Sequence, residues 1–167
     1  LTALDLTADP NLKSVNCSYN NIEELEITGA NRITELHCAS NALTSLDTTH
    51  LEELQSLNCS LNKIAKLDLT GNLLLTDVNC SGNALTSLDV TGLANIDLLY
   101  CSSNELTDLN LTSLKNMTEL DCSDNNLTEL DVTSLSYLNY LACGSNSLTS
   151  LDVSNLVNLE TLDCYDN

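Results

Sequence analysis

The chain has 167 residues, of which 24 are acidic and five are Lys or Arg, so its formal net charge is −19. Such a surface repels phosphate backbones and anionic lipid, which argues against nucleic acids and membrane surfaces as partners. Apolar residues make up 43% of the chain, enough for a core, and Phe and Trp are absent, so that core must be aliphatic. The chain has no run of about 18 apolar residues, so the sequence predicts no membrane-spanning helix.

Eight cysteines recur along the chain, each 21 residues after the previous one, and a Leu column and an Asn column share this period. The cysteines are Cys17, Cys38, Cys59, Cys80, Cys101, Cys122, Cys143 and Cys164. A short, fixed period predicts stacked coils that each contact only their neighbours. The repeat runs through residues 1–167, so we expect a single domain.

Each coil contains an LxC segment (VxC in two coils) and, later, a segment of the LDV type, with Thr, Ser, Asn and Gly between them, as in LNCSLNKIAKLDLT. The alternation in LxC predicts a short strand with Leu and Cys inward. The LDV half predicts a second extended segment with its Asp outward. We therefore expect an all-β-type solenoid of seven to eight coils, with little or no α-helix and a parallel β-sheet on the concave face.

The LxxLxCxxNxL segment resembles the signature of leucine-rich repeats, and its Cys and Asn occur in all eight repeats. The 21-residue length, the inward Cys and the LDV half resemble the cysteine-ladder repeats of bacterial surface proteins, the internalins. This resemblance implies recognition of a protein or glycan, in adhesion, host interaction or virulence, by an extracellular or cell-surface bacterial protein. Internalins also carry a helical cap, an immunoglobulin-like region and a wall anchor. No segment here matches these parts, so we expect a fragment that lacks its caps.

Two inward columns have structural explanations. Parallel cysteine side chains on neighbouring strands do not bring their Cβ atoms to the spacing that a disulfide prefers, so the Cys column predicts buried, reduced thiols. A soft-metal or redox column is the alternative, but it lacks the His partners and mixed spacings of a metal site. The Asn column predicts a hydrogen-bonded ladder, because an amide can satisfy bend groups of its own and the adjacent coil.

An outward column is acidic in seven coils: Asp5, Glu26, Asp47, Asp68, Asp89, Asn110, Asp131 and Asp152. The residue two positions later is Thr in seven coils and Ser154 in the last. This pairing predicts turns in which the Asp accepts hydrogen bonds from the following residues. A row of weak Ca²⁺ sites is the alternative, although Ca²⁺ prefers six to eight converging oxygens. An ice-binding surface is a further alternative that rests on regular geometry alone.

The outward positions of the first strand vary far more than the inward columns do. One column reads Ser14, Glu35, Ser56, Asp77, Leu98, Glu119, Tyr140 and Thr161, and the other Asn16, His37, Asn58, Asn79, Tyr100, Asp121, Ala142 and Asp163. Variability on a regular scaffold favours recognition, and Tyr is a common interface anchor. The predicted partner-binding residues are Glu35, His37, Asp77, Leu98, Tyr100, Glu119, Asp121 and Tyr140.

Catalysis finds no support in the sequence. No HExxH, GxSxG, GxGxxG or P-loop motif is present. His37 is outward and the adjacent Cys38 is inward, so they do not form a catalytic pair. We expect neither an enzyme nor a bound cofactor or metal. A binding module competes with a rigid structural spacer and, less well, with a regular surface for ions or ice.

Overall fold

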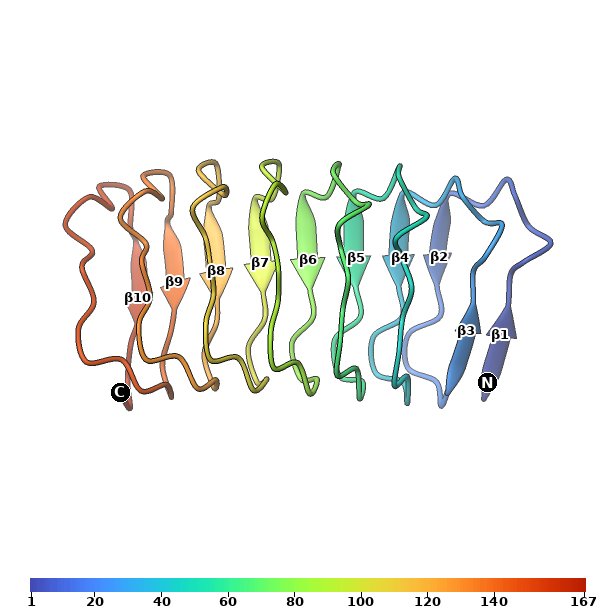
Figure 1. Ribbon diagram of the computed structural model, residues 1–167, viewed down its shortest axis with the longest axis horizontal. Coiled ribbons are helices and arrows are strands. Elements are labelled where there is room, and N and C mark those ends of the chain that lie inside the picture. The colour runs from blue at the N-terminus through green and yellow to red at the C-terminus, as the bar shows by residue number, and fades with distance from the viewer.

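The computed structural model describes residues 1–167 and contains ten three-residue β-strands and no helix. The chain winds through successive coils, so its two ends lie at opposite ends of a rod (Figure 1). Eight strands, one from each coil, pair in parallel in the order β2-β4-β5-β6-β7-β8-β9-β10. They are β2 (Ser14–Asn16), β4 (Glu35–His37), β5 (Ser56–Asn58), β6 (Asp77–Asn79), β7 (Leu98–Tyr100), β8 (Glu119–Asp121), β9 (Tyr140–Ala142) and β10 (Thr161–Asp163). The predicted solenoid of about eight 21-residue coils is therefore confirmed.

The second extended segment pairs as a regular strand only near the N-terminus. Strands β1 (Ala3–Asp5) and β3 (Glu24–Glu26) form a separate parallel pair, and their arrows point opposite to those of the main sheet in Figure 1. Farther along, this side carries one isolated bridge, between Asp47 and Asp68. Backbone hydrogen bonding between coils is thus concentrated on the side of the eight-stranded sheet.

The pleat explains how such short strands hold a core. Side chains alternate between the two faces of a strand, so the middle residue points inward and its two neighbours point outward. Leu36, Leu57, Val78 and Leu99, the middle residues of β4 to β7, are at most 1% exposed. They belong to a single cluster of 43 buried residues that runs from Val15 to Leu156. Because each coil adds the same layer, the core extends along the whole rod.

The Asn column forms the predicted ladder. The Asn83 side-chain Nδ2 donates to the carbonyls of Cys59 and Cys80 at 3.1 and 3.0 Å, and its Oδ1 accepts the Ile64 N–H at 3.0 Å. One amide thus satisfies backbone groups in its own coil and in the preceding one. The same pattern recurs from Asn41 to Asn167, and no buried side-chain nitrogen or oxygen in the chain lacks a partner.

The residue before each of these asparagines lies in the left-handed region, a feature that the sequence analysis did not identify. In seven coils it is not Gly: Tyr19, Ser40, Leu61, Ser103, Asp124, Ser145 and Asp166 have φ between 50° and 58°. In the fourth coil it is Gly82, with φ 65°. Left-handed backbone costs roughly 1–2 kcal/mol for a residue with a Cβ. The hydrogen bonds of the adjacent Asn offset this strain in every coil.

The cysteines form a column of free thiols, as predicted, with one difference. Cys17 to Cys143 are buried, whereas Cys164 is exposed. Cys164 follows β10, the edge strand of the sheet, so it is covered from one side only. The Cys backbone also extends the sheet, since Cys38 N–H donates to the Asn58 carbonyl at 2.8 Å and Cys59 N–H to that of Asn79 at 2.9 Å.

Candidate binding surface

All eight predicted partner-binding residues lie on the outward face of the eight-stranded sheet. The register is constant, so equivalent positions of successive coils stand side by side. Leu98 pairs with Glu119 and Glu119 with Tyr140, while Tyr100 pairs with Asp121 and Asp121 with Ala142. Neighbouring strands are about 4.8 Å apart, so β7, β8 and β9 bring Leu98, Tyr100, Glu119, Asp121 and Tyr140 into one patch, which we call the central patch.

The side chains of the central patch cover one another. Leu98, Tyr100, Glu119, Asp121 and Tyr140 are all only partly exposed, although they point away from the core. The Tyr100 hydroxyl donates a hydrogen bond to Glu119 Oε2 on the next strand. The patch is therefore a packed surface of two phenols, one aliphatic side chain and two carboxylates.

The nearby carboxylates also raise the pKa values of the two tyrosines. Burial, the hydrogen bond to Glu119 and the negative charges nearby raise the pKa of Tyr100 to about 12. Burial followed by the charges of Asp121, Asp163 and Glu119 raises the pKa of Tyr140. Both phenols are therefore neutral hydrogen-bond donors throughout the physiological pH range.

The other three predicted residues lie on the same face but outside the central patch. Glu35 accepts a hydrogen bond from Ser14 Oγ at 2.9 Å, and His37 Nε2 lies 3.5 Å from Ser56 Oγ. Asp77 Oδ2 accepts the Thr76 hydroxyl at 2.6 Å. Each is engaged with a short neighbouring side chain, and no aromatic residue of β4 to β6 accompanies them.

The second outward column has a partly structural role that the sequence analysis missed. In four coils this column holds an Asn or Asp whose side-chain Oδ1 accepts the N–H of a Ser two positions later: Asn16 with Ser18, Asn58 with Ser60, Asn79 with Ser81, and Asp121 with Ser123. Half of this column therefore caps the end of its own strand. His37, Tyr100, Ala142 and Asp163 make no such bond, so these are the positions where the scaffold leaves the residue type free. The residues two positions after them, Ala39, Ser102, Gly144 and Tyr165, give a partial signal of this in the sequence.

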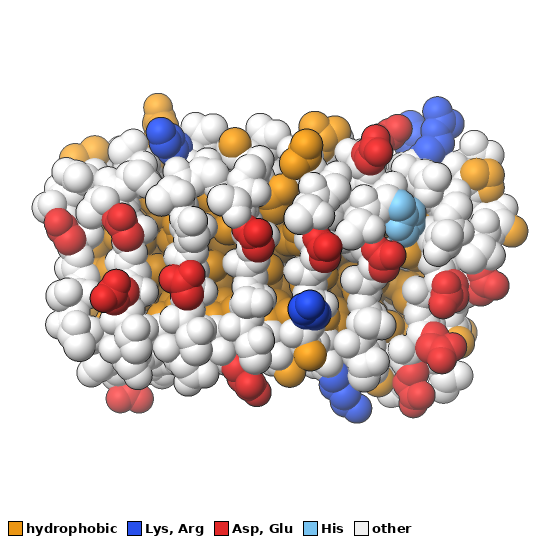
Figure 2. All heavy atoms as spheres, viewed as in Figure 1, with side chains coloured by type: hydrophobic (Ala, Val, Ile, Leu, Met, Phe, Trp, Pro, Cys, Tyr) orange, Lys and Arg blue, Asp and Glu red, His pale blue; other side chains and the backbone are white.

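The opposite face carries the acidic column (Figure 2). As predicted, the Asp residues of this column close turns: Asp68 Oδ1 accepts the Thr70 N–H at 3.0 Å and its hydroxyl at 2.7 Å. Glu26, the one Glu of the column, is the exception and makes no such bond. These two bonds lower the pKa of Asp68 more than the charges of Asp47 and Asp89 raise it. Asn110 makes the same pair of bonds with Thr112, so the turn needs an acceptor oxygen rather than a charge.

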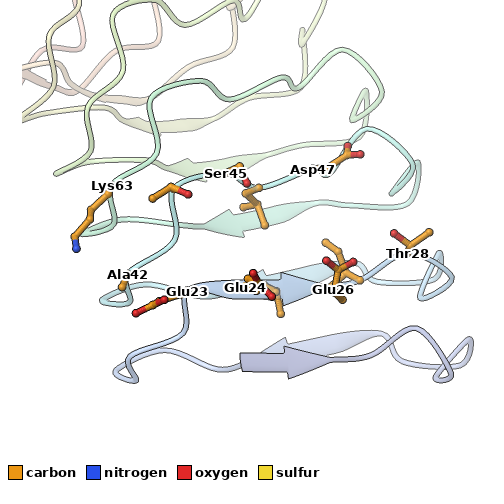
Figure 3. Close-up of a pocket in the computed structure, with 12 residues that line it drawn as sticks. Glu23, Glu24, Glu26, Thr28, Ala42, Ser45, Asp47 and Lys63 are labelled. Atoms are coloured by element: carbon orange, nitrogen blue, oxygen red, sulfur yellow. The ribbon is translucent and has the colours of Figure 1, made fainter. Parts of the chain in front are cut away.

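The face seen in Figure 2 also has furrows between its coils, and the cleft of Figure 3 is one of them. It measures about 540 Å³ and lies between β3 and the segment Ser45–Asp47 of the next coil. It exists because β3 pairs with β1 on one edge and with no strand on the other. Glu23, Glu24, Glu26 and Asp47 line it, with Lys63 toward one end. None of the predicted partner-binding residues contributes to this cleft.

The arrangement contains no catalytic constellation. His37 and Cys38 point to opposite faces of the sheet, and burial strongly raises the pKa of the Cys38 thiol, so this thiol is a poor nucleophile. No group of three or more His, Cys, Asp or Glu side chains is placed to hold a metal ion. No helix long and apolar enough to cross a membrane is present.

Comparison with known proteins places the chain among leucine-rich repeat structures, although no family model and no curated protein matches it. It is 31% identical to the functional domain of InlJ from Listeria monocytogenes, which includes a cysteine ladder; the match covers 98% of this chain and 46% of that one, with a TM-score of 0.75.

Two further solved structures, both under 25% identical, show the fold alone. The internalin inlF of Listeria monocytogenes is 23% identical, with 93% of this chain and 48% of that chain covered and a TM-score of 0.87. The plant peptide hormone receptor RGFR1, solved in complex with RGF2, is 22% identical, with 93% and 29% covered and a TM-score of 0.83. The chain thus spans less than half the length of each of these proteins. Its repeat, its buried cysteine in successive coils and its similarity to InlJ show that it is a leucine-rich repeat protein of the cysteine-ladder type.

Proposed function

We propose that this chain is a recognition module that binds a protein on the outward face of its eight-stranded sheet. The observation that carries the proposal is the contrast between columns. The inward positions repeat almost unchanged, whereas the outward positions of β7 to β9 hold Leu, Tyr, Glu, Asp and Tyr. A purely structural sheet face needs no half-buried tyrosines, and Tyr is enriched among residues that dominate binding energy.

The comparisons support this proposal at the level of the fold. RGFR1 was solved in complex with RGF2, so one protein of this architecture is known to hold a peptide. The similarity to InlJ and to internalins favours a bacterial protein of the cell surface or the secreted fraction, with a role in adhesion or host interaction. A glycan is the other ligand class for such a surface, and a rigid spacer is the alternative without a ligand.

The test begins with capture of the partner by the intact chain, followed by a comparison of variants. Replacing both Tyr100 and Tyr140 by Ala should weaken binding at least tenfold, because each ring is an anchor in a packed patch. The matched control replaces Asp68 and Asp89 by Asn, on the opposite face, and should bind normally. Circular dichroism melts confirm that both variants stay folded.

The outcome separates the candidate functions. Loss of binding in the tyrosine variant alone supports recognition by the sheet face. Normal binding by the tyrosine variant, together with loss in the Asp68 and Asp89 variant, would move the site to the opposite face. A partner that tolerates both variants would bind outside both faces, whereas failure to capture any partner would favour the spacer.

A further inference from the structure

The outward face of the eight-stranded sheet has no Lys or Arg. Its sixteen strand positions include five carboxylates, Glu35, Asp77, Glu119, Asp121 and Asp163, and His37 is the only basic side chain. All five Lys and Arg residues of the chain lie outside the strands: Lys13, Arg32, Lys63, Lys66 and Lys115. A partner that covers this face must therefore bring positive charge or leave buried carboxylates unpaired, which is costly.

Three adjacent strands at the C-terminal end of the sheet place a small residue between two of these acids. Asp121 on β8 pairs with Ala142 on β9, and Ala142 pairs with Asp163 on β10. The two acids therefore flank Ala142, each about 4.8 Å away across one strand spacing. Ala142 is only 5% exposed although it faces outward, so longer neighbouring side chains rise around its methyl group.

Aromatic and acidic side chains surround Ala142. Tyr140 stands two residues before Ala142 on β9, and Tyr100 pairs across the sheet with Asp121. The charges of Asp121 and Asp163 both act on the Tyr140 phenol. Asp121 Oδ1 already accepts the N–H and the hydroxyl of Ser123, at 3.1 and 2.6 Å, which fixes the carboxylate and leaves Oδ2 for a ligand.

We propose that the surface over Ala142 binds the side chain of a Lys or Arg in a basic segment of the protein partner. The cationic head lies between Asp121 and Asp163, and the aliphatic stem packs on Ala142 beside the Tyr140 ring. Arg suits the site well, since its planar fork of donors pairs with carboxylates and stacks on aromatic faces. The inference rests on the proposed function, because it names the chemistry of the partner at that sheet face.

A metal ion fits this place less well than an organic cation. Its two carboxylates stand on strands about 9.6 Å apart, two strand spacings. A bare Ca²⁺ needs several oxygens at 2.3–2.6 Å, and no metal-binding group occurs here. A guanidinium or ammonium on a flexible stem spans the gap with separate hydrogen bonds.

The test uses a synthetic probe and the intact chain. The probe is an acetylated, amidated heptapeptide, Gly-Ser-Arg-Leu-Arg-Ser-Gly, and its control has Gln in place of both Arg. Amide chemical shifts of the ¹⁵N-labelled chain, followed in a titration at low salt, should change around residues 121, 142 and 163 with the Arg peptide only. Replacing Asp121 and Asp163 together by Asn should weaken this binding at least tenfold, with little structural change, since an Asn oxygen can still accept from Ser123.

Two matched variants separate a specific site from general attraction. Asp68→Asn combined with Asp89→Asn removes the same charge from the opposite face and should change affinity less than twofold. Ala142→Leu keeps every charge but places a larger side chain between the two carboxylates and should weaken binding at least fivefold. Equal losses in the two Asp pairs, or normal binding by the Ala142→Leu variant, would overturn the inference.

The natural partner distinguishes failure of this inference from failure of the proposed function. If the Tyr100 and Tyr140 variant loses the partner while the Asp121 and Asp163 variant keeps it, the sheet face is the binding surface and the cationic site is wrong. If neither variant affects the partner, both proposals are wrong. Loss of partner binding in both variants supports both proposals.

Discussion

At the scale of single residues, two polar side chains in the core show how the repeat tolerates exceptions. Thr48 and Asn72 occupy inward columns that hold Leu, Ile or Val in the neighbouring coils, at Ile27, Leu69 and Leu93. Both are fully buried. The Thr48 hydroxyl donates to Asn72 Oδ1 at 2.9 Å, and Asn72 Nδ2 donates to the carbonyls of Thr48 and Leu51 at 2.7 and 3.0 Å. Each residue satisfies the other, so the two substitutions in adjacent coils form a unit.

This pairing predicts strong coupling in a double-mutant cycle. Thr48→Val alone leaves the buried Asn72 Oδ1 without its donor, which should lower the free energy of unfolding by about 1–3 kcal/mol. Thr48→Val together with Asn72→Leu restores the residue types of the other coils and should cost less than Thr48→Val alone, or stabilise the chain. Urea unfolding of the wild type, both single variants and the double variant measures the coupling. Additive effects would show that the two side chains act independently.

At the scale of the repeated elements, the Asn ladder and the Cys ladder have different roles. Each Asn joins two coils through hydrogen bonds to backbone groups, and a Cys carbonyl such as that of Cys59 accepts from the Asn of its own coil and from that of the next. Each Cys fills a narrow inward column beside the strand and extends the backbone ladder. A substitution in either column therefore weakens the contact between neighbouring coils rather than one local site.

The Asn ladder can be tested at Asn83, which links the third and fourth coils. Asn83→Ala removes the acceptor of the Ile64 N–H and the donor to Cys59 and Cys80. The carbonyls of Cys59 and Cys80 keep hydrogen bonds from Asn62 and Asn104, so the Ile64 N–H is the group left unpaired. An unpaired N–H there should lower the free energy of unfolding by at least about 1 kcal/mol. Asn126→Ala is the control, since Asn126 is exposed in a bend and its side chain bonds no partner in the chain. An Asn83→Ala variant that melts with the wild type would contradict the structural role of the ladder.

The Cys ladder predicts a defined number of reactive thiols. In the folded chain a disulfide reagent should modify one thiol, Cys164, because the other seven are buried. After denaturation all eight should react, since none is in a disulfide. Cys164→Ala should reduce the native count to zero and the denatured count to seven. Fewer than eight thiols in the denatured wild type would reveal bridges or a bound metal.

At the scale of the whole molecule, the buried thiols should make the free energy of unfolding decrease at alkaline pH. Burial raises the pKa of Cys80 to about 12 and that of Cys143 to about 11, and it also raises those of Cys59 and Cys101 well above the ordinary value of 9.0. A raised folded pKa means that the folded chain holds these protons more tightly than the unfolded chain. Their contribution to stability is complete below pH 9 and is lost as the pH rises through the folded pKa values.

The free energy of unfolding should therefore fall steadily between pH 9 and pH 12. Each thiol contributes a slope of up to about 1.4 kcal/mol per pH unit while only the unfolded form is ionised. Cys80→Ala should reduce this slope, because it removes one shielded thiol. Urea unfolding at intervals of half a pH unit provides the measurement. A stability profile that is flat from pH 9 to pH 11 would show that the thiols are not shielded from water.

The sequence alone determined the architecture, because a constant period allows few arrangements of the coils. With each coil contacting only its neighbours, positions 21 residues apart must stack, so the inward Leu, Cys and Asn columns and the outward Asp turns follow from their spacing and side-chain chemistry. It also placed Leu98, Tyr100, Glu119, Asp121 and Tyr140 on adjacent strands of one face, since the register of a solenoid is its period. Whether that face binds a partner stays a prediction.

Tertiary structure decided what a one-dimensional pattern does not contain. The period does not say which outward side chains lean toward each other, and only the folded chain shows Tyr100 bonded to Glu119. Nor does it say that Asp121 already caps its own strand, or that Thr48 and Asn72 compensate each other across two coils. Paired strands on the second side of the rod occur only as β1 and β3. These features depend on side-chain length, rotamer and the spacing between coils on each side of the rod, which are set when the coils pack and not by the repeat itself.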